Sequence, residues 1–300
     1  MKGLTFTVAL MFFALSLLVF SSLYQLGLLE FNRLTNKNSL MDRIYYKYDS
    51  LENSLRNILN EELGFDKLNV SFSEGNFNVV NFTEQLPLDP SVYKTDIDRY
   101  KIFAETKLTE PNIFVSLNIS EIRDNLPLTI LPYNIDYLHI NGLGQRQVEV
   151  DPKTSWNSIK SYYVKITLLE QGNLTEPGEW SGAGCTGNDF RLDVTVIGNT
   201  STFRDARNID SARMCKLPVD DIDCPAGLGF VKVTQNANSR EEDRGVLQID
   251  VQQNCNITAE ISLNLTDMPG KLGVGLPAQS IKVKEMLYEI EKNDTIYIYK

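Results

Sequence analysis

The chain has 300 residues, 42% of them hydrophobic, and a formal net charge of −10 at neutral pH. This composition is that of a globular protein with enough apolar residues for one large or two modest cores, and it excludes a disordered chain. Residues 1–64 carry six basic and six acidic side chains, so the negative charge belongs to residues 65–300, whose acidic surface repels phosphate backbones and excludes nucleic acid as an expected partner.

The N-terminal region contains one long apolar stretch, Leu4–Leu29, with no charged residue between Lys2 and Glu30. As an α-helix it would be about 39 Å long, which exceeds the roughly 30 Å hydrocarbon core of a bilayer. Three interpretations are open: a secretory signal cleaved near Ser21, a helix inside a soluble core, and a retained helix in lipid or in a helix bundle. The apolar residues continue beyond Ser21 and surround the whole helix, which favours the retained helix.

The residues on either side of this stretch give a more specific indication. Lys2-Gly3 directly precedes Leu4-Thr5-Phe6-Thr7, and an amphipathic helix and a β-rich region follow the apolar run. This order resembles the type IV pilin superfamily, in particular archaeal pilin-like proteins, over residues 1–64. The resemblance implies that a peptidase cleaves after Gly3, so that residues 1–3 are a leader and Leu4 is the mature N-terminus; Val8 stands where many pilins have Glu. It also implies that the helix waits in the membrane before it packs into a filament core.

A second, amphipathic helix is predicted over residues 39–63, after the polar segment 35–38, so that residues 4–64 form one long helical region. Ser39 with Asp42 forms a capping box that begins a new helix or restarts the first one, and Gly64 before Phe65 ends it. Its apolar residues recur at three- and four-residue spacing: Met41, Ile44, Tyr48, Leu51, Leu55, Ile58 and Leu59. This stripe is expected to pack either on the protein's own β domain or on neighbouring copies.

From residue 65 the hydrophobic period changes from helical to two, as expected for half-buried strands. Apolar and polar residues alternate in six segments, which are residues 68–72, 115–119, 192–196, 247–251, 259–265 and 296–299. Turn signals separate them, and no alternation of strands with helices calls for a parallel sheet. We therefore predict an α+β protein, in which a long N-terminal hydrophobic and amphipathic helix precedes an antiparallel β-sandwich. Residues 65–300 form one extracellular β domain, or two modules that divide near residue 151.

Eight N-glycosylation sequons occur after residue 65 and none before it. From the Asn, Ser and Thr content, chance predicts about 2.5. Three of the Asn residues lie in phase with polar residues of their strands, so we expect their side chains to face solvent. The excess predicts a glycosylated outer domain, against the alternative of a β protein that is merely rich in Asn and Thr. The sequons are Asn69, Asn81, Asn118, Asn173, Asn199, Asn256, Asn264 and Asn293, and those in phase are Asn69, Asn118 and Asn264.

The four cysteines, Cys185, Cys215, Cys224 and Cys255, all follow residue 151. An even number confined to one region is typical of an oxidising compartment. They form no C-x-x-C pair and the chain has one His, so two disulfides are expected rather than a zinc site. Three pairings are open; one of them joins Cys215 to Cys224 across residues 216–223 and leaves Cys185 with Cys255. Sequons and cysteines together predict that residues 65–300 lie outside the cell, at the cell surface, with the positive N-terminus inside.

Signals for catalysis are weak, and no enzyme is predicted. His139, the only histidine, is expected on the surface or in a turn near a strand end rather than as a general base. The segment 182–187 matches G-x-G-x-x-G, but it lacks the preceding strand and the following helix of a dinucleotide site, so no phosphate site is predicted.

Two further groups of residues have both a functional and a plainer interpretation. Asp220, Asp221 and Asp223 would offer oxygen ligands to Ca²⁺, but their spacing is not that of an EF-hand, and a solvated charge run is expected. Trp156 and Trp180 would line a sugar-binding face or fill the core, and core filling is expected. Paired carboxylates for glycoside hydrolysis stay open, because only the fold brings such residues together.

Taken together, these features predict a pilin-like subunit of an extracellular filament, with helices packed in the core and glycosylated β domains exposed for adhesion. The expected partners are other copies of the chain and, before assembly, the membrane, with no cofactor and no metal. The alternative is a monomeric, membrane-anchored ectodomain that binds a ligand or carbohydrate, and an anchored hydrolase is a third hypothesis.

Overall fold

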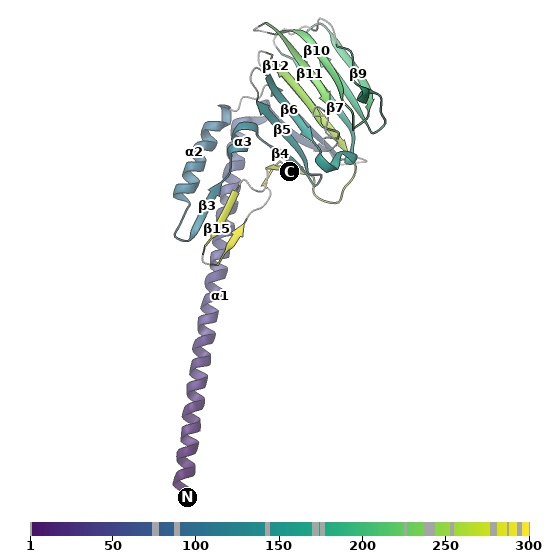
Figure 1. Ribbon diagram of the computed structural model, residues 1–300. Coiled ribbons are helices and arrows are strands. Elements are labelled where there is room, and N and C mark those ends of the chain that lie inside the picture. The colour runs from purple at the N-terminus through teal and green to yellow at the C-terminus, as the bar shows by residue number, and fades with distance from the viewer. Residues whose placement is uncertain are drawn as a thin grey trace.

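The computed structural model describes residues 2–299 except 74–77, 87–90, 142–144, 170–173, 175–177, 225–226, 237–243, 253–254, 277–280, 287 and 293–295. The molecule has a long helical stem and a β-rich head (Figure 1). The stem is α1 (Lys2–Lys67), whose N-terminus lies far from the head. The head contains a β-sandwich and, along the upper part of α1, a smaller layer of helices and strands.

The stem helix is uninterrupted over its 66 residues, which gives a length of roughly 99 Å. The helical predictions for residues 4–29 and 39–63 are confirmed, but residues 35–38 are helical as well, so Ser39 does not begin a new helix. The helix ends at Lys67 rather than at Gly64. The polar residues 35–38 fit within the helix. The hydroxyl of Thr35, for example, donates to the carbonyl oxygen of Phe31 one turn earlier (2.9 Å).

The C-terminal half of α1 packs against the head through one apolar stripe. Its fully buried residues are Ile44, Tyr48, Leu51, Leu55 and Leu59. They contact α2 (Ser91–Lys107) and strands β15 (Ile281–Glu285) and β1 (Leu68–Ser73). Of the two expected packing partners, the stripe therefore uses the protein's own head.

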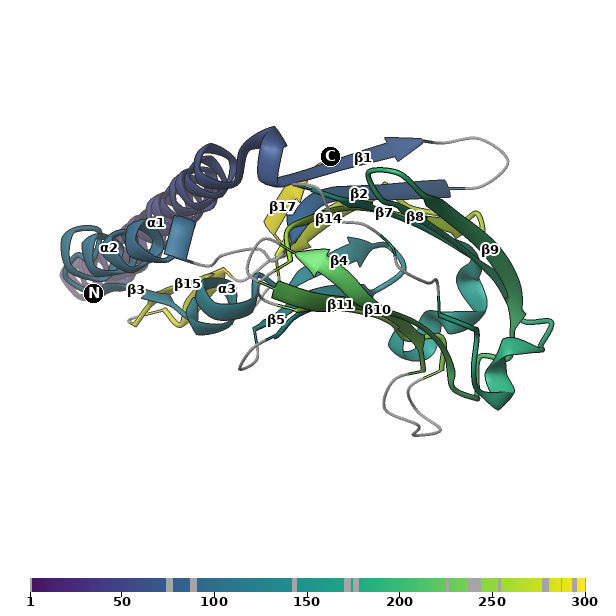
Figure 2. The ribbon, with the colours of Figure 1, turned by 90° about the horizontal axis from the view of Figure 1, so that it is seen from above.

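Two facing sheets form the sandwich (Figure 2). The six-stranded sheet has the order β1, β2 (Asn78–Leu86), β13 (Ile257–Leu265), β7 (Ile159–Leu168), β8 (Phe190–Ile197) and β9 (Thr202–Ile209). The eight-stranded sheet has the order β10 (Cys215–Cys224), β11 (Gly227–Gln235), β12 (Leu247–Gln252), β6 (Gln145–Asp151), β5 (Ile135–Asn141), β4 (Leu128–Leu131), β14 (Gly273–Leu276) and β17 (Ile296–Tyr299). The pairing is antiparallel except between β7 and β8.

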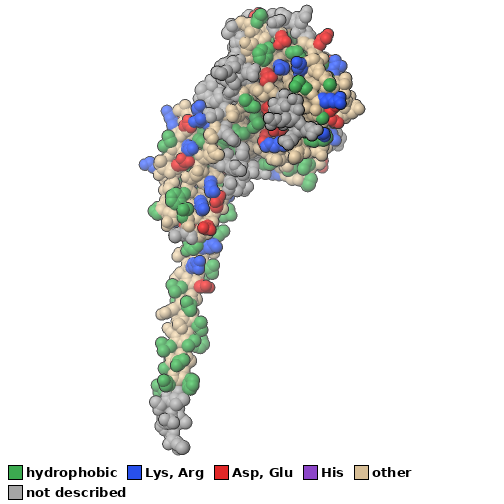
Figure 3. Space-filling model, viewed as in Figure 1, with side chains coloured by type: hydrophobic (Ala, Val, Ile, Leu, Met, Phe, Trp, Pro, Cys, Tyr) green, Lys and Arg blue, Asp and Glu red, His purple; other side chains and the backbone are tan. Residues whose placement is uncertain are grey.

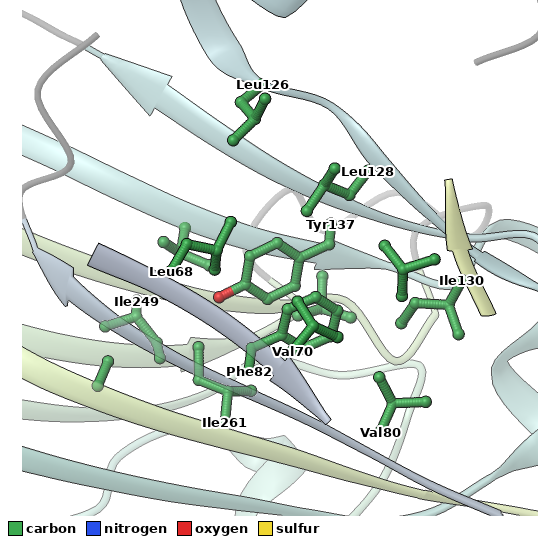
Figure 4. Packing of buried hydrophobic residues seen from close by; sticks show 14 of the residues in the cluster. Leu68, Val70, Val80, Phe82, Leu126, Leu128, Ile130, Tyr137, Ile249 and Ile261 are labelled. Carbon is green, nitrogen blue, oxygen red and sulfur yellow. The ribbon is translucent and has the colours of Figure 1, made fainter. Parts of the chain in front are cut away.

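Each sheet contains strands from both halves of the chain. β2 pairs with β13, and β6 pairs with β12, so the chain does not divide into two modules near residue 151. Five of the six segments predicted as strands lie wholly within strands, and the sixth, 115–119, is a strand only as far as Leu117. Alternation of apolar and polar residues matches a sheet with one face in the core. In Figure 4 the Tyr137 ring lies among apolar side chains of both sheets, and it stacks on Phe82 with ring centroids 3.9 Å apart.

The smaller layer along α1 was not foreseen as a unit. It consists of α2, α3 (Ser120–Asn125) and a three-stranded sheet with the order β16 (Ile290–Lys292), β15 and β3 (Ile113–Leu117). α2 buries Tyr93, Ile97 and Ala104 at helical spacing. That period is present in the sequence, but residues such as Thr, Tyr and Ile, which also suit strands, weaken the signal. Two short 3₁₀ turns, η1 (Lys153–Ser158) and η2 (Ala183–Cys185), connect strands of the sandwich.

Two disulfides, Cys185–Cys215 and Cys224–Cys255, fasten strands and loops of the sandwich. The prediction of two disulfides is confirmed. Cys215 does not pair with Cys224, because these residues are the two ends of β10 and an extended strand separates them by about 30 Å.

Candidate functional site

The surface that stands out most is the N-terminal half of α1. We call it the exposed stem and define it as residues 10–34, all of whose side chains are exposed. Large apolar side chains cover its circumference, with exposed fractions from 43% at Leu28 to 73% at Phe20. Figure 3 shows apolar side chains along the stem, with charged groups only towards the head. Contiguous apolar surface of this extent marks a contact with lipid or with protein.

Two serine hydroxyls of the exposed stem bond to the backbone of their own helix. Ser16 donates its hydroxyl to the carbonyl oxygen of Phe13 (2.8 Å), and Ser22 donates to that of Leu18 (3.0 Å). The backbone bonds are internal to the helix. A helix that satisfies its own polar groups is what a medium without water requires.

The length of this region also suits a bilayer. Within the described part of the chain, α1 is the one helix long and apolar enough to cross a membrane. A secretory signal near an N-terminus passes the same test, so length and composition fit either a membrane anchor or a signal. The expected processing position between Gly3 and Leu4 lies in the first turn of α1, and cleavage there stays a prediction.

Ionic contacts hold α1 on the head just above the exposed stem. Lys292 Nζ lies 2.7 Å from Asp49 Oδ1 and 4.4 Å from the centroid of the Tyr48 ring. Lys47 Nζ lies 2.6 Å from Glu110 Oε1 and donates to the carbonyl oxygen of Leu108 (2.7 Å). Burial, with a smaller effect of the nearby Arg43 charge, lowers the pKa of Lys47. These contacts supplement the apolar stripe that joins α1 to the head.

A hollow of about 430 Å³ lies where α1 passes from uncovered to covered. Its walls come from α1 and from the segment after α2: Ser39, Asp42, Arg43, Tyr46, Lys47, Ser50, Leu108 and Glu110. Arg43 and Lys47 both pair with Glu110 across it. The charged side chains that line the hollow therefore largely neutralise one another.

The expectation for His139 is wrong, because this residue is buried between the two sheets. Its Nε2 lies 2.6 Å from Glu84 Oε2 on β2, and the Tyr137 hydroxyl donates to the same carboxylate. β5 turns Ile135, Tyr137 and His139 inward, whereas Leu138 and Ile140 lie on the other face and are half-buried. Apolar residues therefore lie on both faces of this strand, and the sequence pattern does not show which face carries His139.

Burial and the charge of Glu84 both shift the pKa values of the other two residues in this buried cluster. Burial lowers the pKa of His139, but the charge of Glu84 and its hydrogen bond outweigh that effect and raise it above the ordinary value. Burial, followed by the Glu84 charge, raises the pKa of Tyr137 well above the usual range. Because Glu84, Tyr137 and His139 are almost fully buried, we assign them a structural role in joining the sheets.

The sequons that fall within the described residues are accessible. Asn69, Asn81 and Asn264 are half-buried. Asn118, Asn199 and Asn256 are exposed. Asn173 and Asn293 lie outside the described residues. Exposure permits modification, and glycosylation itself stays a prediction.

The acidic run is part of a strand rather than of a loop. Asp220 and Asp223 are exposed on β10, beside a register shift between Val219 and Ile222. Within the described ranges, no group of three or more His, Cys, Asp or Glu lies close enough to hold a metal ion.

Segment 182–187 holds the short turn η2, and β8 follows it as predicted. Both tryptophans are half-buried, and Trp180 packs against the hydrophobic core, in line with the expectation. Arg244 lies 5.3 Å from the centroid of the Trp156 ring. Trp180 lines a groove with Phe203, Asp205 and Arg207, three residues that the sequence analysis missed because their strand shows no apolar alternation.

Comparisons with protein-family models, with curated proteins and with solved structures each found no match.

Proposed function

We propose that this chain is a structural subunit of an extracellular, pilus-like filament of the type IV pilin kind, and that it works by assembly rather than by catalysis. The exposed stems pack together in the filament core, and the heads face outward for adhesion. The observation that carries the proposal is the apolar surface of residues 10–34, which the rest of the described chain leaves uncovered.

The energetics favour burial of this surface. Each large apolar side chain that leaves water contributes roughly 1.5–3 kcal/mol. Lipid and neighbouring helices satisfy this requirement about equally, because both are apolar. The stem therefore lies in the membrane before assembly and among the stems of other subunits afterwards. Close packing between helices, which lipid cannot match, then favours the assembled state.

Features of the head support an extracellular position. Both disulfides are in the sandwich, and oxidising compartments favour such bonds. Accessible sequons on several strands and loops suit a glycosylated surface. An archaeal source fits the short leader Met1-Lys2-Gly3 and the abundance of sequons.

A monomeric, membrane-anchored ectodomain is the alternative. The observation in its favour is that Leu4–Leu29 alone is long enough to cross a bilayer. Such a protein needs no contact between stems and no removal of residues 1–3.

Intact-mass measurement of the purified native protein, combined with electron microscopy of material sheared from cells, tests the proposal. We expect a mature chain that begins at Leu4 and filaments that contain it. A chain that keeps Met1 and is found only as a membrane-bound monomer supports the alternative. A chain that begins beyond Ser21 overturns both.

A further inference from the structure

An open groove lies at the edge of the sandwich that is farthest from α1. Its volume is about 290 Å³, and it is lined by Gly178, Glu179 and Trp180 on one side and by Phe203, Asp205 and Arg207 of β9 on the other. Figures 1 and 2 both place β9 on the side of the head away from the stem. The groove therefore lies away from the exposed stem, and burial of the stem would leave it uncovered by that stem.

The charged residues of this groove occupy positions that normally belong to a core. Asp205 lies opposite Val194 and Arg207 lies opposite Leu192 in the pairing of β9 with β8. Residues opposite each other in an antiparallel pair share one face, and Val194 and Leu192 are fully buried. The inner face of the sheet thus continues onto β9, where it opens to solvent and becomes polar.

The other wall of the groove is held rigidly on β10. Ser181 and Lys216 exchange two backbone hydrogen bonds of 2.9 Å, and the Cys185–Cys215 disulfide closes the same segment. Glycine permits the close approach: a Cβ at Gly178 would lie 1.6 Å from the carbonyl oxygen of Pro218, and one at Gly182 would lie 2.3 Å from that of Met214. Trp180 is therefore presented by a fixed backbone, as a preorganised binding site requires.

Aromatic and planar polar groups are combined within the groove. Trp180 and Phe203 line the groove and are half-buried, packed in part against the core. Aromatic rings have electron-rich faces that attract C–H groups. Arg207 Nη2 lies 2.8 Å from Asp205 Oδ2, so a carboxylate and a guanidinium are held side by side. Such a pair can accept from one hydroxyl and donate to its neighbour.

We propose that this groove binds a neutral pyranose sugar, with the apolar face of the ring against the aromatic residues and two adjacent hydroxyls on Asp205 and Arg207. Its volume of about 290 Å³ is just below the usual range for ligand sites, about 300–1,000 Å³, and so suits a small ligand such as one sugar ring. The lining has two acidic residues, Glu179 and Asp205, and one basic residue, Arg207. Its net charge is therefore negative, and it repels an acidic sugar. Alternating charged residues along the edge strand β9 also oppose the addition of a peptide strand.

Fluorescence titration of the full chain tests this proposal, in a detergent whose head group is not a sugar. Trp156 and Trp180 are the only tryptophans, so a Trp156→Phe background makes Trp180 the sole indole reporter. The probes are methyl mannoside, methyl galactoside, lactose and chitobiose, with glucuronic acid as the anionic comparison. We expect a saturable change with at least one neutral sugar and a much weaker one with glucuronic acid.

Variants on opposite faces of β9 assign the binding to the groove. Arg207→Gln and Asp205→Asn should each weaken sugar binding at least tenfold. Arg204→Gln, on the other face and paired with Asp193, should leave the affinity unchanged. Circular dichroism of each variant verifies that the head is folded.

The proposal is overturned if none of the neutral sugars titrates, if Arg207→Gln binds like the parent, or if Arg204→Gln weakens binding equally. It does not depend on the filament: a subunit that binds sugar but never assembles fails only the assembly proposal, and one that assembles without binding sugar fails only this one.

Discussion

The two halves of α1 belong to one straight helix yet present opposite surfaces. Between Ile44 and Leu59 the apolar residues form one stripe, and the protein's own head covers it. Between Leu10 and Leu34 they surround the helix, and the described chain covers none of them. A helix with one apolar face finds its partner within a domain, whereas a helix that is apolar all round needs lipid or many neighbouring helices. The arrangement of apolar residues around the helix, more than their number, therefore indicates whether a segment packs within its own domain or needs another partner.

A charge in the exposed stem should have the largest effect. We expect Leu18→Lys to abolish filaments and weaken membrane retention, because a lysine at the centre of a membrane helix costs about 2.5–3.5 kcal/mol and the cost recurs in every subunit. Asn53→Lys, at an exposed position of the covered half, is the matched control and should assemble normally. Electron microscopy and membrane fractionation check both variants, and normal filaments from Leu18→Lys would contradict the distinction between the two halves.

Variants of the buried Glu84–His139 pair test whether the stability of the head can be changed without an effect on assembly. Glu84→Gln should lower the free energy of unfolding by about 3–5 kcal/mol, because it breaks a buried ion pair. Glu260→Gln, which breaks the partly exposed pair with Lys165, should cost about 0–1 kcal/mol. Denaturant unfolding measures both. Provided the head still folds, we expect filaments from each variant.

The same pair predicts a pH dependence. The pKa of His139 is raised in the folded protein, so its contribution to stability is complete below its unfolded pKa of about 6.5 and is lost as pH rises through the folded value. In Glu84→Gln the effects of Glu84 are removed and burial, the largest effect, is opposed only by the backbone hydrogen bonds of Leu126 and Asn125. Stability should therefore fall as pH decreases. Unfolding curves between about pH 5.5 and 8.5 check the sign; identical slopes in parent and variant would refute the assignment.

Truncation of the buried stripe should have the next largest effect. Leu55→Ala should destabilise the docking of α1 by about 2–5 kcal/mol, because Leu55 is fully buried and its loss leaves a cavity. Asn57→Ala, exposed on the same turn, is the control and should change stability little. Hydrogen exchange along residues 44–59 measures the effect, and unchanged protection in Leu55→Ala would show that the stripe is not what holds the helix.

The smallest effect is expected at the ion pairs between α1 and the segment after α2. Glu110→Gln removes the shared partner of Arg43 and Lys47, and we expect a loss of less than about 1 kcal/mol because all three side chains are partly solvated. The effect should shrink further at high salt. Thermal unfolding at two salt concentrations measures it. A loss as large as that of Leu55→Ala would mean that charge, rather than the apolar stripe, seats the helix.

Local patterns predicted the elements whose surroundings are simple. Strands such as β13 alternate strictly because one face meets the core and the other meets solvent. The stem is equally plain, since its composition is uniform. α2 was missed because its few buried residues are spaced among residues that also suit strands.

Residues whose roles depend on distant partners could not be predicted from local patterns. His139 has its partner, Glu84, in the opposite sheet, and nothing near it in sequence indicates that contact. The disulfide pairing follows from the extension of β10. In the groove, Trp180 meets β9 only because the free edges of the two sheets lie on the same side, so no spacing in the sequence relates them.

The last strands of the chain lie against the first helix, since β15 and β16 contact α1 and Lys292 pairs with Asp49 across 243 positions. The ribosome therefore synthesises the exposed stem first, and the strands that cover the C-terminal half of α1 last. Until the ribosome has released nearly the whole polypeptide, the apolar stripe of α1 lacks part of its cover, and contacts so remote in sequence form slowly. A premature stop before residue 281 would remove β15, β16 and the Lys292 partner of Asp49, and would thus leave α1 incompletely attached to the head.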